Sequence, residues 1–221
     1  MGAAAEVVVA DLTQPAELRA VEERVAADPA LEVLVNNAGF AAYMPFVRLD
    51  PDRAEELIRL HVVALTRLTR AALPGMIARG RGTIVNVSSL LAFSASIGDR
   101  PLPARATYAA TKSYINTFTE ILHHELRGTG VRVQVLCPGI VDTEFHGPDF
   151  DPSRAPYPPL MPDAVVEAAL AGLRLGEVIC VPALGDPALV TQNQESQRRL
   201  LQASVGGSIA ERYRVAGQSV G

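Results

Sequence analysis

A tyrosine and a lysine are the pair in this sequence best suited to moving a proton. Tyr108 and Lys112 stand in the segment TYAATK, and residues four positions apart lie on one face of a helix. A lysine near a phenol favours the phenolate and lowers the pKa of the tyrosine, which makes the phenol a usable proton donor and acceptor. On its own the spacing is weak, because such pairs also occur by chance on solvated helices.

Polar or turn-forming residues follow four of the predicted strands. In chain order they are Asp11, then Asn36-Asn37-Ala38-Gly39, then Ser88-Ser89, and then Pro138-Gly139. Ligands of open parallel sheets bind beyond the carboxyl ends of the strands. Each of these groups alone is typical of an ordinary turn, but the four together predict a site at one edge of the sheet.

The elements that would position these residues alternate along the chain. The predicted strands are Val7–Asp11, Leu31–Asn36, Thr83–Ser88, Val131–Cys137 and Val178–Val181. The predicted helices are Pro15–Ala27, Pro51–Arg79, Ala106–Arg127 and Pro162–Leu175, followed by a polar-faced helix in the tail. The strand segments are apolar on successive residues, as strands buried on both faces are. The alternation predicts an α/β fold, a Rossmann-like doubly wound parallel sheet in three α/β/α layers.

The longest helical stretch, Pro51–Arg79, contains a proline. Because proline lacks the backbone N–H and clashes with the preceding turn, we expect a long helix that ends near Leu73 and a short one that begins after Pro74. Asp50 stands directly before the stretch and is a plausible N-terminal cap.

The composition narrows the class of protein. The 221 residues can bury one substantial core, and a hydrophobic content of 48% excludes disorder. With a net charge of −4, the sequence shows no basic character of the kind that binds nucleic acid. No uncharged apolar run approaches the ~18 residues of a membrane span, and the N-terminus, which already carries Glu6, does not resemble a signal peptide. We expect a soluble, cytoplasmic protein that binds neither nucleic acid nor membranes.

Neither the cysteines nor the paired histidines indicate a metal site. Cys137 and Cys180 each fall in an apolar, strand-like run, which is typical of buried free thiols. His123 and His124 are adjacent, and neighbouring residues of a helix point about 100° apart, so the two rings cannot easily chelate one ion.

Four segments together resemble the short-chain dehydrogenase/reductase family in order and spacing. They are LEVLVNNAG, GTIVNVSS, TYAATK and VQVLCPGIVDTEF. They match the Asn-Asn-Ala-Gly strand end, the serine after the following strand, Tyr-x-x-x-Lys, and Pro-Gly with a nearby threonine. The resemblance covers the chain from about Asp11 to Cys180.

The resemblance implies reversible hydride transfer between NAD or NADP and an alcohol or carbonyl carbon. Tyr108 would be the acid/base, Lys112 would lower its pKa and hold the nicotinamide ribose, and Ser89 would position the substrate carbonyl, with Ser88 as the fallback. The residues that would contact the cofactor are Asp11, Leu12, Asn36, Ala38, Gly39, Tyr108, Lys112, Pro138, Gly139, Ile140 and Thr143. The resemblance also implies a homodimer or homotetramer paired through the two long helices.

The sequence departs from the family at one site position and in one loop. His61 stands where family members usually carry an asparagine that holds a water chain. A histidine can hydrogen-bond water too, and it can titrate near neutral pH, so a catalytic role for His61 and a space-filling role are both open. Ser89 and Tyr108 are also further apart than is usual, which lengthens a loop around Ser94–Pro103 beside the cleft.

A larger departure lies at the N-terminus. The family begins with a strand, a Gly-rich turn, a helix, a second strand and another helix, and this sequence contains none of them. The Gly-rich turn binds the cofactor diphosphate at a helix N-terminus, and the second strand selects NAD or NADP, so that choice is unreadable. The chain thus resembles an N-terminally truncated member, with residues 1–185 as a partial NAD(P)-binding domain and 186–221 as a helical tail of the same domain.

In the family's sheet, the first two strands lie between the strands that match Val7–Asp11 and Leu31–Asn36. Without them, Leu31–Asn36 has an open, apolar edge. We therefore expect one of two outcomes. Either Val7–Asp11 pairs with Leu31–Asn36, or it stays detached and loosely packed.

Two function classes compete. The first is an oxidoreductase of the short-chain type, and the second is a catalytically silent relative that serves as a binding or scaffold subunit. The segment Glu144–Met161 predicts a mobile substrate lid. Its apolar members suggest an apolar ketone or alcohol, or alternatively they only pack the lid onto the body; they are Phe145, Phe150, Tyr157 and Leu160.

Overall fold

Four parallel strands form one sheet in the order of the chain. The computed structural model describes residues 4–98, 102–147, 151, 153, 155 and 157–214. The strands are β1 (Val33–Asn36), β2 (Gly82–Val87), β3 (Val131–Leu136) and β4 (Ile179–Cys180). Their order in the sheet is β1-β2-β3-β4, and every neighbouring pair is parallel. These strands confirm four of the five predicted ones.

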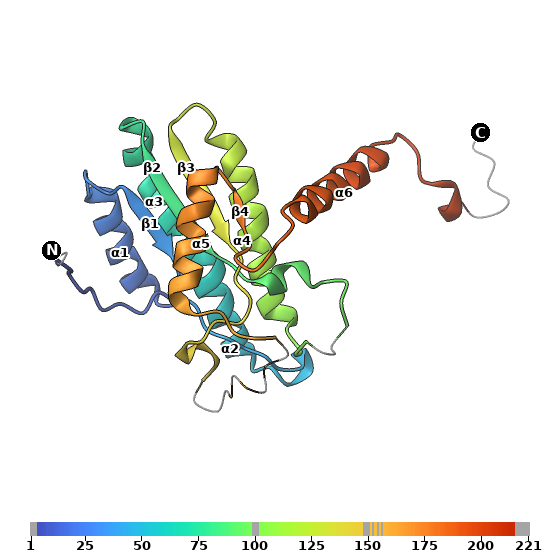
Figure 1. Ribbon diagram of the computed structural model, residues 1–221, viewed down its shortest axis with the longest axis horizontal. Coiled ribbons are helices and arrows are strands. Elements are labelled where there is room, and N and C mark those ends of the chain that lie inside the picture. The colour runs from blue at the N-terminus through green and yellow to red at the C-terminus, as the bar shows by residue number, and fades with distance from the viewer. Residues whose placement is uncertain are drawn as a thin grey trace. The chain divides into compact units, whose positions relative to one another are not determined.

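Helices cover both faces of this sheet (Figure 1). They are α1 (Pro15–Ala27), α2 (Pro51–Ile58), α3 (Leu65–Ala78), α4 (Ala106–Glu125) and α5 (Pro162–Leu175), with short 3-10 turns at Phe46–Arg48, Leu90–Phe93 and Glu144–His146. Helices α3 and α4 pack on one face and α5 on the other, while α1 packs against α3. The three-layer α/β/α arrangement is therefore as predicted.

Alternation along the strands divides the core into two halves. Ile84 and Val133 face α3 and α4, where Met76 and Leu122 are buried against them. The next residue of β2, Val85, faces α5 on the opposite side of the sheet. Because successive side chains of a strand point to opposite faces, apolar residues at every position allow both helical layers to dock.

The predicted helix break at Leu73 is wrong. Pro74 lies inside α3, which continues to Ala78. Buried Ala72 and Met76 flank the proline and pack in the core, and this burial offsets the roughly 3 kcal/mol that an internal proline costs. The irregularity lies earlier, in a π-helical segment at Arg59–Ala64 between α2 and α3. Asp50 does cap α2, because its side chain accepts a hydrogen bond from the Asp52 N–H at 2.9 Å.

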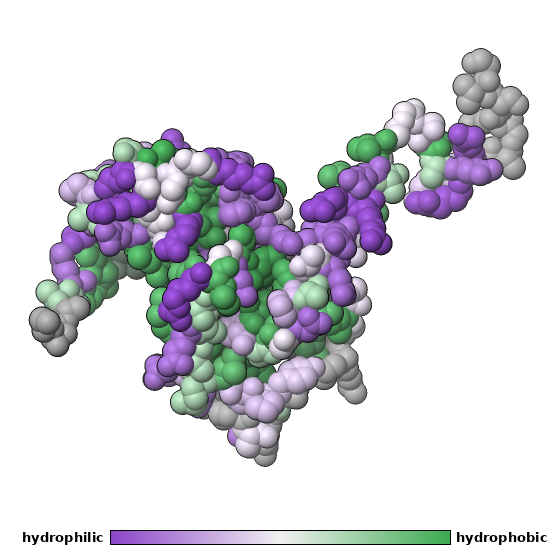
Figure 2. Space-filling view, turned by 45° about the horizontal axis from the view of Figure 1, so that its top comes forward, coloured by the Kyte–Doolittle hydropathy of each residue, from purple (hydrophilic) through white to green (hydrophobic). Residues whose placement is uncertain are grey.

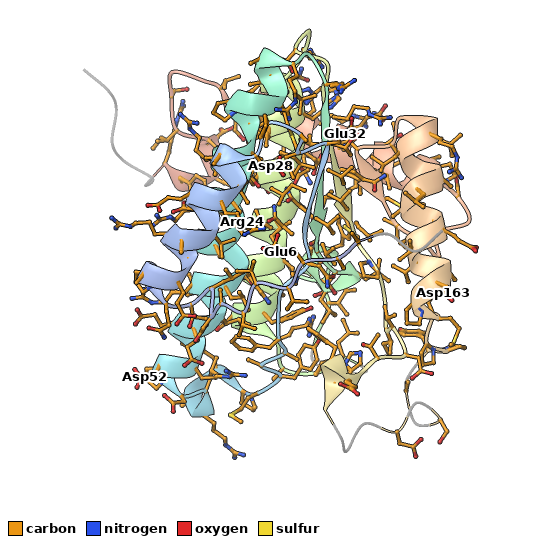
Figure 3. The ribbon with its side chains drawn as sticks, turned by 90° about the vertical axis from the view of Figure 1, so that its left-hand side faces the viewer. Glu6, Arg24, Asp28, Glu32, Asp52 and Asp163 are labelled. Atoms are coloured by element: carbon orange, nitrogen blue, oxygen red, sulfur yellow. The ribbon has the colours of Figure 1, made fainter. Side chains whose placement is uncertain are left out.

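The predicted strand Val7–Asp11 does not form, and it makes no ladder with β1. Val7 and Val9 are 84% and 93% exposed, so the detached outcome is the one observed. Leu18 of α1 is buried against Leu68 of α3. Instead, Glu6 pairs with Arg24 of α1, and Figure 3 shows these two side chains pointing toward each other.

β1 is therefore an edge strand of the sheet, as predicted, and β4 is the edge strand at the other side. The β1 side chains Val33 and Val35 are 53% and 54% exposed, an unusual position for valines in a parallel sheet.

The chain divides into two compact units, Met1–Ala183 and Leu184–Gly221. The second contains α6 (Ala188–Ser204) and a short 3-10 turn at Glu211–Tyr213, and α6 has no buried residue. That the tail from residue 186 belongs to the same domain stays a prediction. Throughout the described part of the chain, every helix is too short or too polar to cross a membrane.

Candidate active site

One cleft of about 1240 Å³ lies beside the carboxyl ends of the strands and extends across the sheet toward α5. The predicted site residues that line it are Ala38, Gly39, Ser88, Ser89, Tyr108, Lys112, Pro138, Gly139 and Thr143. Valines of the exposed β1 face and apolar residues of α5 line the rest. Figure 2 shows hydrophobic side chains gathered in the hollowed middle of this view. Three strand ends and α4 thus contribute to one site.

Tyr108 is buried among aromatic rings. It is 3% exposed, and its ring meets the rings of Tyr43 at 5.1 Å, His61 at 5.6 Å and Phe145 at 6.4 Å, each edge to face. Burial raises the pKa of Tyr108, because a phenolate is poorly solvated there. Hydrogen bonding to Tyr43 and Ser89 acts in the opposite direction and lowers the pKa.

Lys112 is buried below the ring of Tyr108. Its Nζ lies 5.7 Å from the ring centroid and donates a hydrogen bond to the Val87 carbonyl at 2.9 Å. Burial lowers the pKa of Lys112 to about 8, so a proton leaves this ammonium more readily than an exposed one. That Lys112 lowers the pKa of Tyr108 stays a prediction, because burial has the largest effect on this phenol here and raises its pKa.

Ser88 and Ser89 make different contacts. The Ser88 hydroxyl donates to the Lys112 carbonyl at 3.0 Å and so ties β2 to α4. The Ser89 oxygen accepts from the Leu91 N–H at 3.1 Å, which caps the turn at Leu90–Phe93, and its hydroxyl interacts with Tyr108. These contacts favour Ser89 over the fallback Ser88 as the hydroxyl beside Tyr108.

His61 is fully enclosed, and both ring nitrogens are engaged. Nδ1 lies 3.0 Å from Thr111 Oγ1, and Nε2 accepts a hydrogen bond from the Phe40 N–H at 3.4 Å. The Thr111 hydroxyl donates to the Tyr108 carbonyl, so its oxygen accepts from Nδ1–H. Burial, with the nearby charge of Lys112, lowers the pKa of His61 to about 3. This pKa lies well below the neutral range, which favours the space-filling role; the catalytic role of His61 stays a prediction.

The position of His61 also explains why residue 39 is a glycine. A Cβ added to Gly39 would lie 2.8 Å from His61 Nε2, too close for the ring to keep its place. The histidine and the glycine at the end of β1 therefore form one packing unit beside Tyr108.

Four of the predicted cofactor contacts, Asp11, Leu12, Asn36 and Ile140, do not line the cleft. The Asp11 carboxylate is exposed and accepts hydrogen bonds from the Thr13 N–H and hydroxyl; these bonds lower its pKa. The Ile140 carbonyl accepts from the Leu160 N–H at 2.9 Å, which joins the lid segment to the loop after β3.

Asn36 points into the protein instead. Its Nδ2 donates to Thr69 Oγ1 at 3.0 Å and to Asn86 Oδ1 at 2.8 Å. Asn86 Nδ2 then donates to Thr119 Oγ1 at 2.9 Å. This buried chain of hydrogen bonds joins α3, β1, β2 and α4, so Asn36 shapes the cleft from behind without facing it.

Tyr43 is the site residue that sequence reasoning missed. It lies on the loop after β1, lines the cleft, and has a pKa raised by burial and by its contact with Tyr108. Its only signal in the sequence is an aromatic side chain four positions after Gly39. Of the predicted lid residues, Phe145 lines the cleft, Tyr157 is 58% exposed, and Phe150 lies outside the described residues.

The fold is a Rossmann-like α/β arrangement with a cleft beside the carboxyl ends of its parallel strands. The sequence model of the short chain dehydrogenase family matches residues 1–153. The chain belongs to the short-chain dehydrogenase family.

Relatives and solved structures agree with this placement. The NADP-dependent 3-hydroxy acid dehydrogenase YdfG of Salmonella typhi is 38% identical over 137 residues, which are 59% of this chain and 53% of that protein. A short-chain dehydrogenase from Sphingobium yanoikuyae, solved with NADPH, has a TM-score of 0.85 and 33% identity over 93% of this chain and 78% of that one. The bulky-bulky ketone specific alcohol dehydrogenase of Comamonas testosteroni has a TM-score of 0.81 and 27% identity, over 94% and 77%. The chain spans about half the length of the curated relatives YdfG and an oxidoreductase of Myxococcus xanthus.

Proposed function

We propose that this protein interconverts an alcohol and a carbonyl compound by hydride transfer with NAD or NADP. The observation that carries the proposal is the convergence of Ser89, Tyr108 and Lys112 at one end of a large cleft. A buried phenol, a hydroxyl beside it and a lysine below it supply a proton donor, a positioning group and a cation at a single place.

In the direction of reduction, the substrate carbonyl oxygen lies between the hydroxyls of Ser89 and Tyr108. The Tyr108 proton passes to that oxygen as the alcohol forms, and Tyr108 is left as a phenolate. In the direction of oxidation the phenolate takes the proton back. Lys112 stabilises the phenolate through its positive charge, and burial keeps water from competing for the proton.

The described residues fit the nicotinamide end of the cofactor. Backbone at Ala38–Gly39 and Pro138–Gly139 lines the cleft without bulky side chains, and Thr143 adds a hydroxyl. When bound there, the cofactor supplies or accepts the hydride. The family's Gly-rich diphosphate turn is not among the 221 residues, so these residues account for one end of the cofactor only.

The cleft suggests an apolar substrate. Tyr43 and Phe145 flank Tyr108, and α5 adds Val166 and Leu170. The Comamonas testosteroni neighbour is specific for bulky-bulky ketones, which supports the same substrate class for this protein.

We further propose a homo-oligomer paired through the helical face of α3 and α4. Apolar side chains are exposed there; they are Ile77, Tyr114 and Ile121. Burial of such a face in a second copy would remove them from water.

A fluorescence titration of the purified chain with NADH and with NADPH tests the function. Saturable binding, followed by turnover of apolar ketones that Tyr108→Phe reduces by about 100-fold or more, would support it. Binding without turnover would favour the silent binding subunit instead. Failure of a folded chain to bind either nucleotide would overturn activity for the chain as given, and adding a Gly-rich βαβα segment upstream would then test whether binding needs it.

A further inference from the structure

Tyr43 holds a place beside Tyr108 that the proposed reaction does not yet use. Its ring meets the Tyr108 ring at 5.1 Å and 66°, edge to face, and both side chains line the cleft. The interaction of Tyr43 with Tyr108 also lowers the pKa of the Tyr108 phenol. Two phenol rings from different elements, a loop after β1 and helix α4, thus meet in the cleft.

We propose that Tyr43 is a positioning residue for proton transfer, and that its O–H donates a hydrogen bond to Tyr108 Oη and stabilises the phenolate form of Tyr108. The proposal rests on the acid/base role of Tyr108 proposed above. Tyr108 Oη keeps the electron pair of its O–H bond when the proton passes to the substrate oxygen. Tyr43 keeps its own proton throughout.

The direction of the hydrogen bond follows from the chemistry of the two groups. Their contact raises the pKa of Tyr43 and lowers that of Tyr108, which is the pattern expected when Tyr43 donates and Tyr108 accepts. Tyr108 then has its own hydrogen free for the substrate. A donor to the phenolate becomes stronger as negative charge develops on the oxygen.

The other groups around Tyr108 leave this task to Tyr43. Lys112 Nζ is 5.7 Å from the ring centroid and already donates to the Val87 carbonyl, so it acts on the phenolate at a distance. His61 is neutral, and both of its nitrogens are engaged elsewhere. Glu144 and His146 lie on the lid turn and line the same cleft. Ser89 is the other hydroxyl at Tyr108.

Difluorotyrosine placed at position 108 tests the proposal by fluorine NMR. Its phenol ionises at a lower pH than that of tyrosine, and the fluorine signal follows the ionisation without cofactor or substrate. Tyr43→Phe removes only the hydroxyl and should raise the pKa of the labelled phenol by about one unit, the effect of one hydrogen bond to a charged group. Tyr114→Phe is the matched control, since Tyr114 bonds to Thr66 and stacks on Phe118 outside the cleft.

An unchanged pKa in folded Tyr43→Phe protein would overturn the proposal. Should that variant fail to fold, the reciprocal measurement decides: with the label at position 43, Tyr108→Phe should lower its pKa, and an unchanged value overturns the proposal equally. Because neither titration involves turnover, a failure here is distinguishable from a failure of the proposed dehydrogenase activity. In an active protein, Tyr43→Phe should also move the pH profile of alcohol oxidation toward higher pH.

Discussion

At the scale of single residues, His61 shows how enclosure changes what a side chain can do. The ring is 1% exposed and bridges α4 to the loop after β1 through Thr111 and the Phe40 N–H. A ring with both nitrogens engaged has no free position from which to relay a proton. We therefore infer that His61 braces the wall behind Tyr108 and that it remains neutral at working pH.

This brace predicts a pH-dependent stability. The pKa of His61 is about 3 in the folded chain, below its ordinary 6.5, so between these values only the unfolded chain binds a proton here. The stability contributed by neutral His61 is complete above 6.5 and is lost as the pH falls, by about 1.4 kcal/mol per pH unit. In urea unfolding, His61→Asn should lack this part of the acid sensitivity, so the stability difference between it and the parent should shrink on acidification. A pH-independent difference would refute the neutral, buried ring.

At the scale of elements, the edge strand β1 is the part of the sheet most open to a further strand. Val35 is 54% exposed, whereas its register partner Val85 on β2 is 6% exposed. Parallel strands are ordinarily covered, and an open apolar edge promotes self-association.

Val35→Lys should therefore reduce concentration-dependent association, measured by light scattering, while it changes the free energy of unfolding by less than about 1 kcal/mol. The matched substitution Val85→Lys places the same charge in the core and should destabilise the fold by about 3 kcal/mol or more. Association that is unaffected by Val35→Lys would show that the protein does not self-associate through β1.

At the scale of the whole molecule, the two units predict that the tail is dispensable for folding of the first unit. Helix α6 lies wholly in the second unit and has no buried residue. A chain that ends at Ala183 should keep its thermal midpoint within about 4 °C, the shift that roughly 1 kcal/mol causes. Leu18→Ala, which empties a buried position between α1 and α3, is the contrasting control and should cost about 2–5 kcal/mol. A large loss of thermal stability in the shortened chain would show that the tail is part of the same domain, as the sequence suggested.

Local patterns were sufficient to predict most of the fold. Helices Pro15–Ala27 and Pro162–Leu175 have the predicted bounds, because a proline marks the first turn of each. The proline rule failed at Pro74, where burial of neighbouring side chains outweighs the local cost of the proline. It failed because propensity describes an isolated helix, while packing is a property of the assembled core.

The candidate site divides in the same way. The sequence by itself determined that the residues after successive strands, Ser89 among them, meet at one edge, since parallel strands and right-handed connections bring the strand ends together. The place of Tyr108 and Lys112 beside them was implied by the resemblance to the short-chain family. Only the tertiary structure decided which way the other side chains turn. Asn36 turns inward to Thr69 and Asn86. His61 is buried and bonds to the Phe40 N–H, and the ring of Tyr43 packs on that of Tyr108. The physical reason is that such orientations depend on hydrogen-bond and ring contacts with residues 21 to 65 positions away in the chain, which no local spacing records.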